Sequence, residues 1–332
     1  MEDWKASREH FSRLGWMFLL GTLIIYAAQL IPINIVKAVR PEWMENPDIS
    51  LLLSVLPLYL IGMPLLILLV KKAVPAVTVE QHEMKPGQFA IAAILCFGLV
   101  YITNIVGNIF TFIIGILKGG IVQNVIANVA TSVSIWFVII YMVLIAPIME
   151  EYVFRKLIVD RTVRYGQGVA VVVSGLMFGL FHGNLNQFVY AFALGAFLAF
   201  LYVKTGKLKI TIVLHMMINF VGGVVSVLLV KMIDLESYLK IAVSGDMAAL
   251  MKYVMNHLAG FVLYGAMGLF AFGMIIAGGV LMIVFLVKKR FSLEAGEVVL
   301  PKGKRFSTVI LNPGMFIYCV FWIAAIIYQL FV

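Results

Sequence analysis

Residues 132–155 read SVSIWFVIIYMVLIAPIMEEYVFR, an apolar run that ends in two adjacent glutamates, Glu150 and Glu151, and then in Arg155. An uncharged apolar stretch of this length predicts a membrane-spanning helix. A carboxylate at membrane depth is costly unless it is paired, neutralised or used. The two glutamates are therefore the first residues of this sequence to examine for chemistry.

The composition of the rest of the chain also indicates a membrane protein. Of the 332 residues, 63% are hydrophobic and only 12% are charged, with a mean hydropathy of +1.06. Soluble domains carry about 25% charged residues. Long apolar stretches recur from end to end and leave no room for a sizeable soluble domain. We therefore expect an all-α fold, a polytopic transmembrane helical bundle.

Hydropathy predicts about nine spans, with eight possible. They lie near residues 15–36, 50–70, 88–116, 131–154, 168–184, 187–204, 209–230, 257–287 and 312–332. Most of the 25 basic residues fall in segments on the same side as the N-terminus, which predicts a cytoplasmic N-terminus. The chain is then an integral multi-pass protein, of the cell (plasma) membrane if it is bacterial. The net charge of +9 marks cytoplasmic loops and does not indicate a nucleic-acid partner.

The spacing of the charges separates the two glutamates. Glu151 and Arg155 are four positions apart, so they share a helix face and can pair. Glu150 points about 100° away from Glu151 around the helix, so Arg155 does not satisfy it. Glu150 needs another partner or a chemical role.

Two further polar positions lie inside apolar spans. His182 follows Phe178 in the stretch FGLFHGN, and His215 precedes Asn219 by four positions on one helix face. The fourth and fifth spans read as an antiparallel hairpin that turns near Gly166. Glu150 and His182 are equally distant from that turn, roughly 24 Å at about 1.5 Å per residue. Equal depth on neighbouring helices is what a shared site requires.

A carboxylate, two imidazoles and an amide at this depth suit the water-dependent cleavage of an amide bond. Glu150 with His182 can orient a water molecule and take its proton. His215 and Asn219 can donate hydrogen bonds to the developing oxyanion. Alternatively Glu150, His182 and His215 can hold zinc, with water at its fourth position. The sequence leaves both arrangements open, with no cofactor or with zinc.

Three motifs, in order, resemble those of the CPBP family: Glu-Glu-x-x-x-Arg at 150–155, Phe-x-x-x-His at 178–182 and His-x-x-x-Asn at 215–219. This family, also called the Abi family, groups CAAX proteases and bacteriocin-processing enzymes and includes the type II CAAX prenyl endopeptidases. The resemblance covers roughly residues 135–225. It implies a helical intramembrane protease with its active site within the bilayer. Family members have been described both as metalloproteases and as metal-independent glutamate proteases.

By this resemblance, Glu150 and His182 activate the water and His215 with Asn219 forms the oxyanion site. We expect Glu151, Arg155 and Phe178 to give structural support. The chain divides into N-terminal transmembrane helices (1–130), a core similar to CAAX proteases (131–230), and an outer amphipathic segment followed by C-terminal transmembrane helices (231–332).

The expected activity is that of a membrane endopeptidase similar to CAAX prenyl protease 2, either glutamate- or metal-dependent. Its partners would be the lipid bilayer and a peptide or membrane-tethered protein substrate, without nucleic acid. Two alternatives remain: a catalytically idle relative that acts in bacteriocin immunity or as a scaffold, and a transporter. The transporter needs polar groups along a path through the bilayer, and the remaining spans carry almost none.

Overall fold

The computed structural model describes residues 4–120, 122–301 and 303–331, and these contain helices and connecting segments but no strands. The longer helices are α1 (Trp4–Val39), α2 (Pro47–Pro57), α3 (Met63–Ala73), α4 (Pro86–Lys118), α9 (Gln167–Phe181), α10 (Leu185–Thr205), α11 (Leu208–Asn219), α13 (Leu235–Ser244), α14 (Met247–Asn256), α15 (Leu258–Val287) and α17 (Pro313–Gln329). The shorter helices are α5 (Val125–Ser132), α6 (Ile135–Phe137), α7 (Ala146–Glu151), α8 (Asp160–Thr162), α12 (Ser226–Ile233) and α16 (Arg305–Val309). The prediction of an all-α bundle is confirmed.

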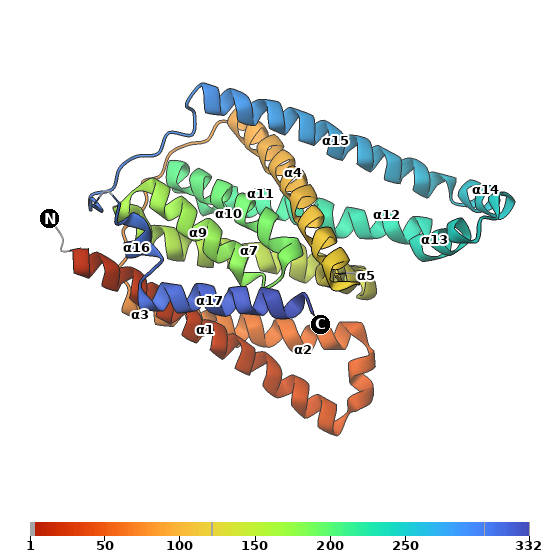
Figure 1. Ribbon diagram of the computed structural model, residues 1–332, viewed down its shortest axis with the longest axis horizontal. Coiled ribbons are helices and arrows are strands. Elements are labelled where there is room, and N and C mark those ends of the chain that lie inside the picture. The colour runs from red at the N-terminus through yellow and green to blue at the C-terminus, as the bar shows by residue number, and fades with distance from the viewer. Residues whose placement is uncertain (1–3, 121, 302, 332) are drawn as a thin grey trace.

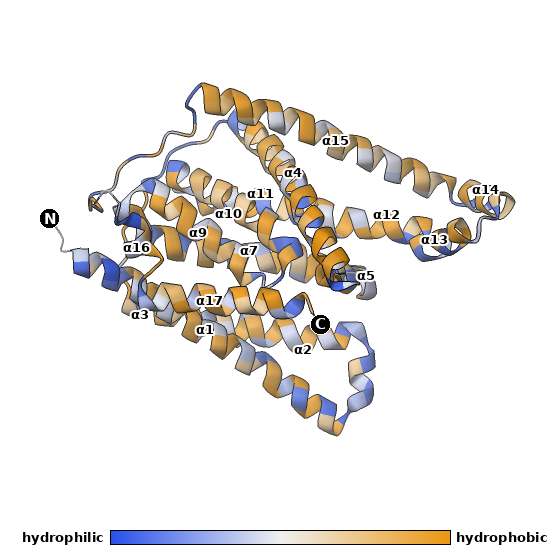
Figure 2. Ribbon diagram, in the orientation of Figure 1, coloured by the Kyte–Doolittle hydropathy of each residue, from blue (hydrophilic) through white to orange (hydrophobic). Residues whose placement is uncertain are grey.

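Within the described residues, seven helical segments are long and apolar enough to cross a membrane. They are Trp4–Val39, Pro47–Ala73, Pro86–Lys118, Ile135–Tyr165, Leu185–Thr205, Leu208–Ile233 and Leu258–Val287. Two shorter apolar helices, Gln167–Phe181 and Pro313–Gln329, complete the set of segments that hydropathy predicted. Most of the long helices run roughly along the long axis of the molecule, whereas α4 crosses them obliquely, and apolar residues cover most of their length (Figures 1 and 2).

The hairpin of α9 and α10 forms the centre of the bundle (Figure 1). Glycines bring the two helices together: a Cβ at Gly175 would lie 2.8 Å from Ala196, and one at Gly179 would lie 3.0 Å from Phe192. Because small residues let helix backbones approach closely, this hairpin is tightly packed. It gives the candidate site a rigid support.

The two ends of the chain pack together beside this centre. Helix α17 lies along α1 (Figure 1), where the side chain of Ser12 accepts a hydrogen bond from the amide of Gly314. Glycine is required at position 314, because a Cβ there would overlap the backbone of Ser12. Helices α1, α3 and α17 thereby form one layer against the central hairpin.

Helix α15 lies at the periphery and packs mainly on α4 (Figure 1). The two helices touch where Gly98 and Gly278 face each other, since a Cβ on either would lie 2.7 Å from the other's Cα. Gly265, Gly268 and Gly273 meet no neighbouring atom within 4 Å. Close packing therefore explains only part of the glycine content of this helix.

The amphipathic stretch 232–255 folds mainly into α13 and α14, a pair of short helices at the far end of α15 (Figure 1). Its large apolar side chains are exposed: Val243, Met247 and Met251 are 86%, 72% and 73% accessible. Such a surface is typical of a helix that lies on a membrane interface. The predicted placement on the outer membrane surface stays a prediction.

Candidate active site

The two glutamates lie in a continuous helical segment, Ile135–Tyr165, that contains two π-helical stretches. They end the α-helical part α7, which sits between π-helical stretches at Val138–Ile145 and Tyr152–Val159. Inserted π-helical turns are frequent at functional sites. The segment also extends eleven residues beyond the predicted end at 154, so that boundary was wrong.

Pro147 explains why Asn219 of helix α11 forms a hydrogen bond with this segment. In the π-helical register the amide of Ala146 donates to the carbonyl of Tyr141, five residues earlier. The next amide in this register would serve Met142, but Pro147 has no N–H to donate. Asn219 supplies the missing bond, because its Nδ2 donates to the Met142 carbonyl at 2.8 Å. One amide hydrogen and the Oδ1 atom of Asn219 remain for other partners.

Glu151 is fully buried in a cluster of polar partners. Its carboxylate pairs with Arg155, with 2.9 Å between Oε2 and Nε, and accepts a second contact from Nη2 at 3.0 Å. Arg155 also donates to Ser174 Oγ at 3.1 Å, and that hydroxyl donates to the Phe154 carbonyl at 2.7 Å. Both side chains of the ion pair are 0% exposed. The predicted Glu151–Arg155 pair therefore forms, and Ser174 links it to α9.

His215 lies between the two glutamates. Its Nδ1 is 2.9 Å from Oε1 of Glu151, and its Nε2 is 3.8 Å from Oε2 of Glu150. A carboxylate accepts hydrogen bonds but does not donate them, so Nδ1 carries the proton of the bond to Glu151. The second nitrogen of His215 faces Glu150.

The ring of His182 is oriented by a similar bond at the end of α9. Its Nδ1 is 2.8 Å from the carbonyl of Phe178, an acceptor only, so Nδ1 must be the protonated nitrogen. In the neutral ring Nε2 is then left with a free lone pair. The helix stops directly afterwards at Gly183, whose φ of +65° favours glycine and whose Cβ would approach Trp322 at 3.1 Å.

Phe178 forms the floor beneath both imidazoles. Its ring centre is 4.8 Å from that of His182 and 5.7 Å from that of His215, edge to face in both cases. The guanidinium of Arg155 lies over the same ring at 4.8 Å. Phe178 thus fixes the spacing between α9 and α11 at the site.

The structure brings the predicted residues into one cluster but changes their pairing. The close contact of Glu150 is with His215, and the predicted joint role of Glu150 and His182 stays a prediction. The side chain of Glu150 is 17% exposed, whereas that of Glu151 is fully buried. Glu150 is thus the more accessible of the two carboxylates.

Sequence reasoning missed Ser174. Ser174 carries a usable signal, because it lies four positions before Phe178 on α9 and so shares the face of the motif. The partnership of Glu151 with His215 was also missed.

The alternative zinc site was tested against the same geometry. No three His, Cys, Asp or Glu side chains among the described residues are grouped so that they could hold a metal ion. The Nδ1 atoms of both histidines are engaged, so their Nε2 atoms are the nitrogens that would bind zinc, and Nε2 of His215 faces the Glu150 carboxylate. The zinc alternative of Glu150, His182 and His215 stays a prediction.

Comparison with known proteins identifies the family of this chain. The family model for type II CAAX prenyl endopeptidase Rce1-like proteins matches residues 131–221, which contain all three motifs. The membrane-embedded CAAX protease MroQ of Staphylococcus aureus is 30% identical over 222 residues, which cover 61% of this chain and 86% of that protein. The chain belongs to the CAAX protease family.

A second relative of this CAAX protease is the putative membrane peptidase YdiL of Bacillus subtilis, which is 28% identical over 159 residues. That match covers 46% of this chain and 63% of YdiL. No solved structure matches the chain. The family match and the two relatives show a membrane protease that is an integral membrane protein. They also confirm the resemblance seen in the three motifs.

Proposed function

We propose that this protein is an intramembrane endopeptidase that hydrolyses a peptide bond in a peptide or membrane-associated protein without a metal ion. The observation that carries the proposal is the contrast between Glu150 and Glu151. One carboxylate is fully buried and neutralised by Arg155, whereas the other is accessible and faces His215. An accessible carboxylate beside two oriented imidazoles is suited to general base catalysis.

In the proposed reaction Glu150 takes a proton from a water molecule held between it and Nε2 of His182. The resulting hydroxide attacks the carbonyl carbon of the scissile bond, and the carbonyl oxygen becomes an oxyanion. Glu150 then returns the proton to the leaving amine as the C–N bond breaks. His182 can accept a hydrogen bond from the water because its Nδ1 proton is committed to Phe178.

His215 and Asn219 would stabilise the oxyanion. His215 already donates Nδ1–H to Glu151, so a donor at Nε2 requires the imidazolium form. In that form the positive charges of His215 and Arg155 balance the negative charges of Glu150 and Glu151. Asn219 offers the amide hydrogen that does not bind Met142.

The substrate class and the orientation in the membrane belong to this proposal. The name of MroQ describes a CAAX protease, and we extend to this chain only a peptide or membrane-tethered substrate in contact with the bilayer. The basic loops support a cytoplasmic N-terminus, in the plasma membrane if the chain is bacterial.

The test uses the full chain reconstituted in liposomes with a quenched-fluorescent peptide library. We expect Glu150→Ala and His182→Ala to abolish cleavage while the melting temperature stays near that of the wild type. Glu297→Ala serves as the control, because Glu297 is exposed and makes no ion pair among the described residues. Full activity in either site variant would refute the assignment. A folded wild type that cleaves no member of the library favours the idle relative.

A measurement of metal content distinguishes the proposed metal-independent reaction from the zinc-dependent alternative. We expect purified, active protein to hold less than one zinc per chain and to keep its activity after treatment with a chelator. Loss of activity with the chelator, restored by added zinc, would instead favour the metal-dependent alternative of Glu150, His182 and His215.

A further inference from the structure

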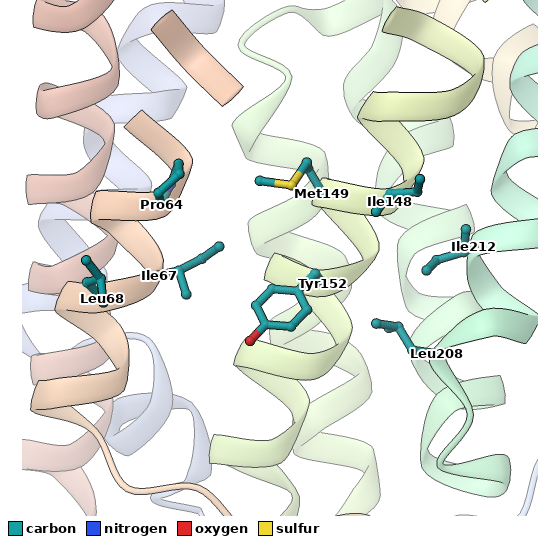
Figure 3. A pocket seen from close by; sticks show the side chains of 8 residues that line it. All are labelled: Pro64, Ile67, Leu68, Ile148, Met149, Tyr152, Leu208 and Ile212. Carbon is teal, nitrogen blue, oxygen red and sulfur yellow. The ribbon is translucent and has the colours of Figure 1, made fainter. Parts of the chain in front are cut away.

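An apolar groove lies beside the site, between α3 and α11. It has a volume of about 500 Å³. Its lining residues are Pro64, Ile67, Leu68, Ile148, Met149, Tyr152, Leu208 and Ile212. Figure 3 shows the side chains of α3 and α11 on either side of Met149 and Tyr152, with Ile67 directed toward Tyr152. Leu68 and Ile148 are 52% and 46% exposed, so the groove is open at its surface.

A polar cavity of about 450 Å³ continues from one end of this groove. The two share Tyr152 and Leu208, so they form one elongated site with an apolar part and a polar part. The polar part is lined by Gln81, Tyr152, Lys156, Tyr202, Gly206, Lys207, Leu208 and Lys209. A fourth lysine, Lys71, lies 5.4 Å from the ring centre of Tyr152.

Positive charge is in excess at this end. Lys156 pairs with Asp160 at 2.7 Å, and Lys207 pairs with Glu83. Lys71 and Lys209 have no carboxylate within ion-pair distance among the described residues. The side chain of Glu83 is 89% exposed, and such surface pairs are weak, so an anion can compete with it for Lys207. The first turn of α11 also forms one wall, and its helix dipole adds to the positive potential.

We propose that this composite site binds an anionic phospholipid, with one acyl chain in the apolar groove and the phosphate on Lys207 and Lys209. The shape of the site carries the inference, because a phospholipid presents the same sequence of an apolar chain followed by an anionic group. Basic sites between transmembrane helices are known to select anionic head groups. The proposal does not depend on proteolysis.

The groove also leads toward the candidate active site. Leu208, Ile212, His215 and Asn219 follow one face of α11 at intervals of four, three and four residues. A bound acyl chain would therefore end about one helical turn from His215. Any other apolar chain that enters between α3 and α11 must compete with it.

The experiment measures lipid retained by the full-length protein in neutral detergent by native mass spectrometry, with phosphatidylglycerol and phosphatidylcholine added in equal amounts. We expect the wild type to retain phosphatidylglycerol preferentially. Lys207→Gln with Lys209→Gln should weaken its binding about 30-fold. Leu68→Trp, which fills the groove, should reduce the binding of both lipids.

The matched control is Lys240→Gln with Lys252→Gln on α13 and α14. Lys240 pairs with the exposed Glu236 as Lys207 pairs with Glu83, and Lys252, like Lys209, has no carboxylate partner within the described residues. This control should retain lipid as the wild type does. Equal retention of the two lipids by the wild type would overturn the proposal. So would unchanged binding in the Lys207/Lys209 variant, or a peptide in place of lipid in the purified protein.

Discussion

The surroundings of Glu150 and Glu151 differ more than their adjacency suggests. Glu151 is fully buried and contacts Arg155 and His215. Glu150 is 17% exposed, and its close contact is with His215 at 3.8 Å. Glu151 therefore belongs to a closed network in which each charge is balanced. Glu150 belongs to the open side of the cluster, together with His182 and Asn219.

This difference shows how a membrane protein can keep one carboxylate reactive beside another that is inert. A buried charge is tolerated when it is paired and hydrogen-bonded. The Glu151–Arg155–Ser174 network meets that condition and also holds His215 in place. Glu150 lies outside this network, and in the proposed function it is the carboxylate that takes part in the chemistry.

Among substitutions that test this difference between the two glutamates, Glu150→Gln should have the largest effect. It keeps the shape of the side chain and removes the base. We expect the rate of cleavage to fall about 10⁴-fold, because a general base contributes up to this factor. Stability should change little, since Glu150 is partly exposed. The measurements are cleavage of a fluorogenic peptide and thermal unfolding in the same detergent. A variant with more than a tenth of the wild-type rate would contradict the role of Glu150.

The second substitution, Glu151→Gln, should lower the stability of the folded protein. It leaves the buried Arg155 without its counter-charge, and removal of one partner from a buried ion pair costs about 3–5 kcal/mol. Adding Arg155→Met should restore much of that stability because no charge is then unpaired. Chemical unfolding of the single and double variants tests this. A double variant less stable than Glu151→Gln would show that the pair does not act as a unit.

The sequence allowed most of the fold to be predicted, because hydropathy acts locally. The predicted spans correspond to seven long and two shorter apolar helices within the described residues. The error at the end of the fourth span has a physical cause. Arg155, Asp160 and Arg161 resemble a polar boundary, yet they are 0%, 4% and 6% exposed, since partners on other elements bury them.

The site was less accessible to prediction, because its contacts join three helices. Depth along a hairpin placed Glu150 level with His182, but the close contact of Glu150 in the structure is with His215. The same argument could not give the rotation of α11, which places His215 between both glutamates. The bond of Asn219 to Met142 depends on a π-helical register before Pro147 that no hydropathy pattern reveals.

That bond allows the structural and chemical roles of Asn219 to be separated. Asn219→Ala should lower the rate about 10²–10³-fold if its amide stabilises the oxyanion, and it also leaves the Met142 carbonyl unpaired. Pro147→Ala supplies an N–H to that carbonyl. In the combined variant, thermal stability should recover while activity stays low. Recovery of both would assign Asn219 a packing role only.

The smallest expected effect comes from an exposed carboxylate in a connecting segment. The hydrogen bond from Lys207, together with its charge, lowers the pKa of Glu83. A depressed pKa means that the native state favours the ionised form, so the stabilisation is present at neutral pH. It disappears as the pH falls through the native pKa, below roughly 4.3. Because Glu83 is exposed, solvent screens the pair and the contribution is small.

We therefore expect Glu83→Gln to unfold at a slightly lower temperature than the wild type at pH 7, and this difference should shrink as the pH falls through the native pKa of Glu83. Glu297→Gln, which removes an exposed carboxylate without an ion pair among the described residues, should show no such pH-dependent difference. A large loss of stability in Glu83→Gln would mean that its pair with Lys207 acts like the buried pair of Glu151. The contrast between a screened and a buried carboxylate would then fail at this position, and so would the argument that an anion can displace Glu83 from Lys207.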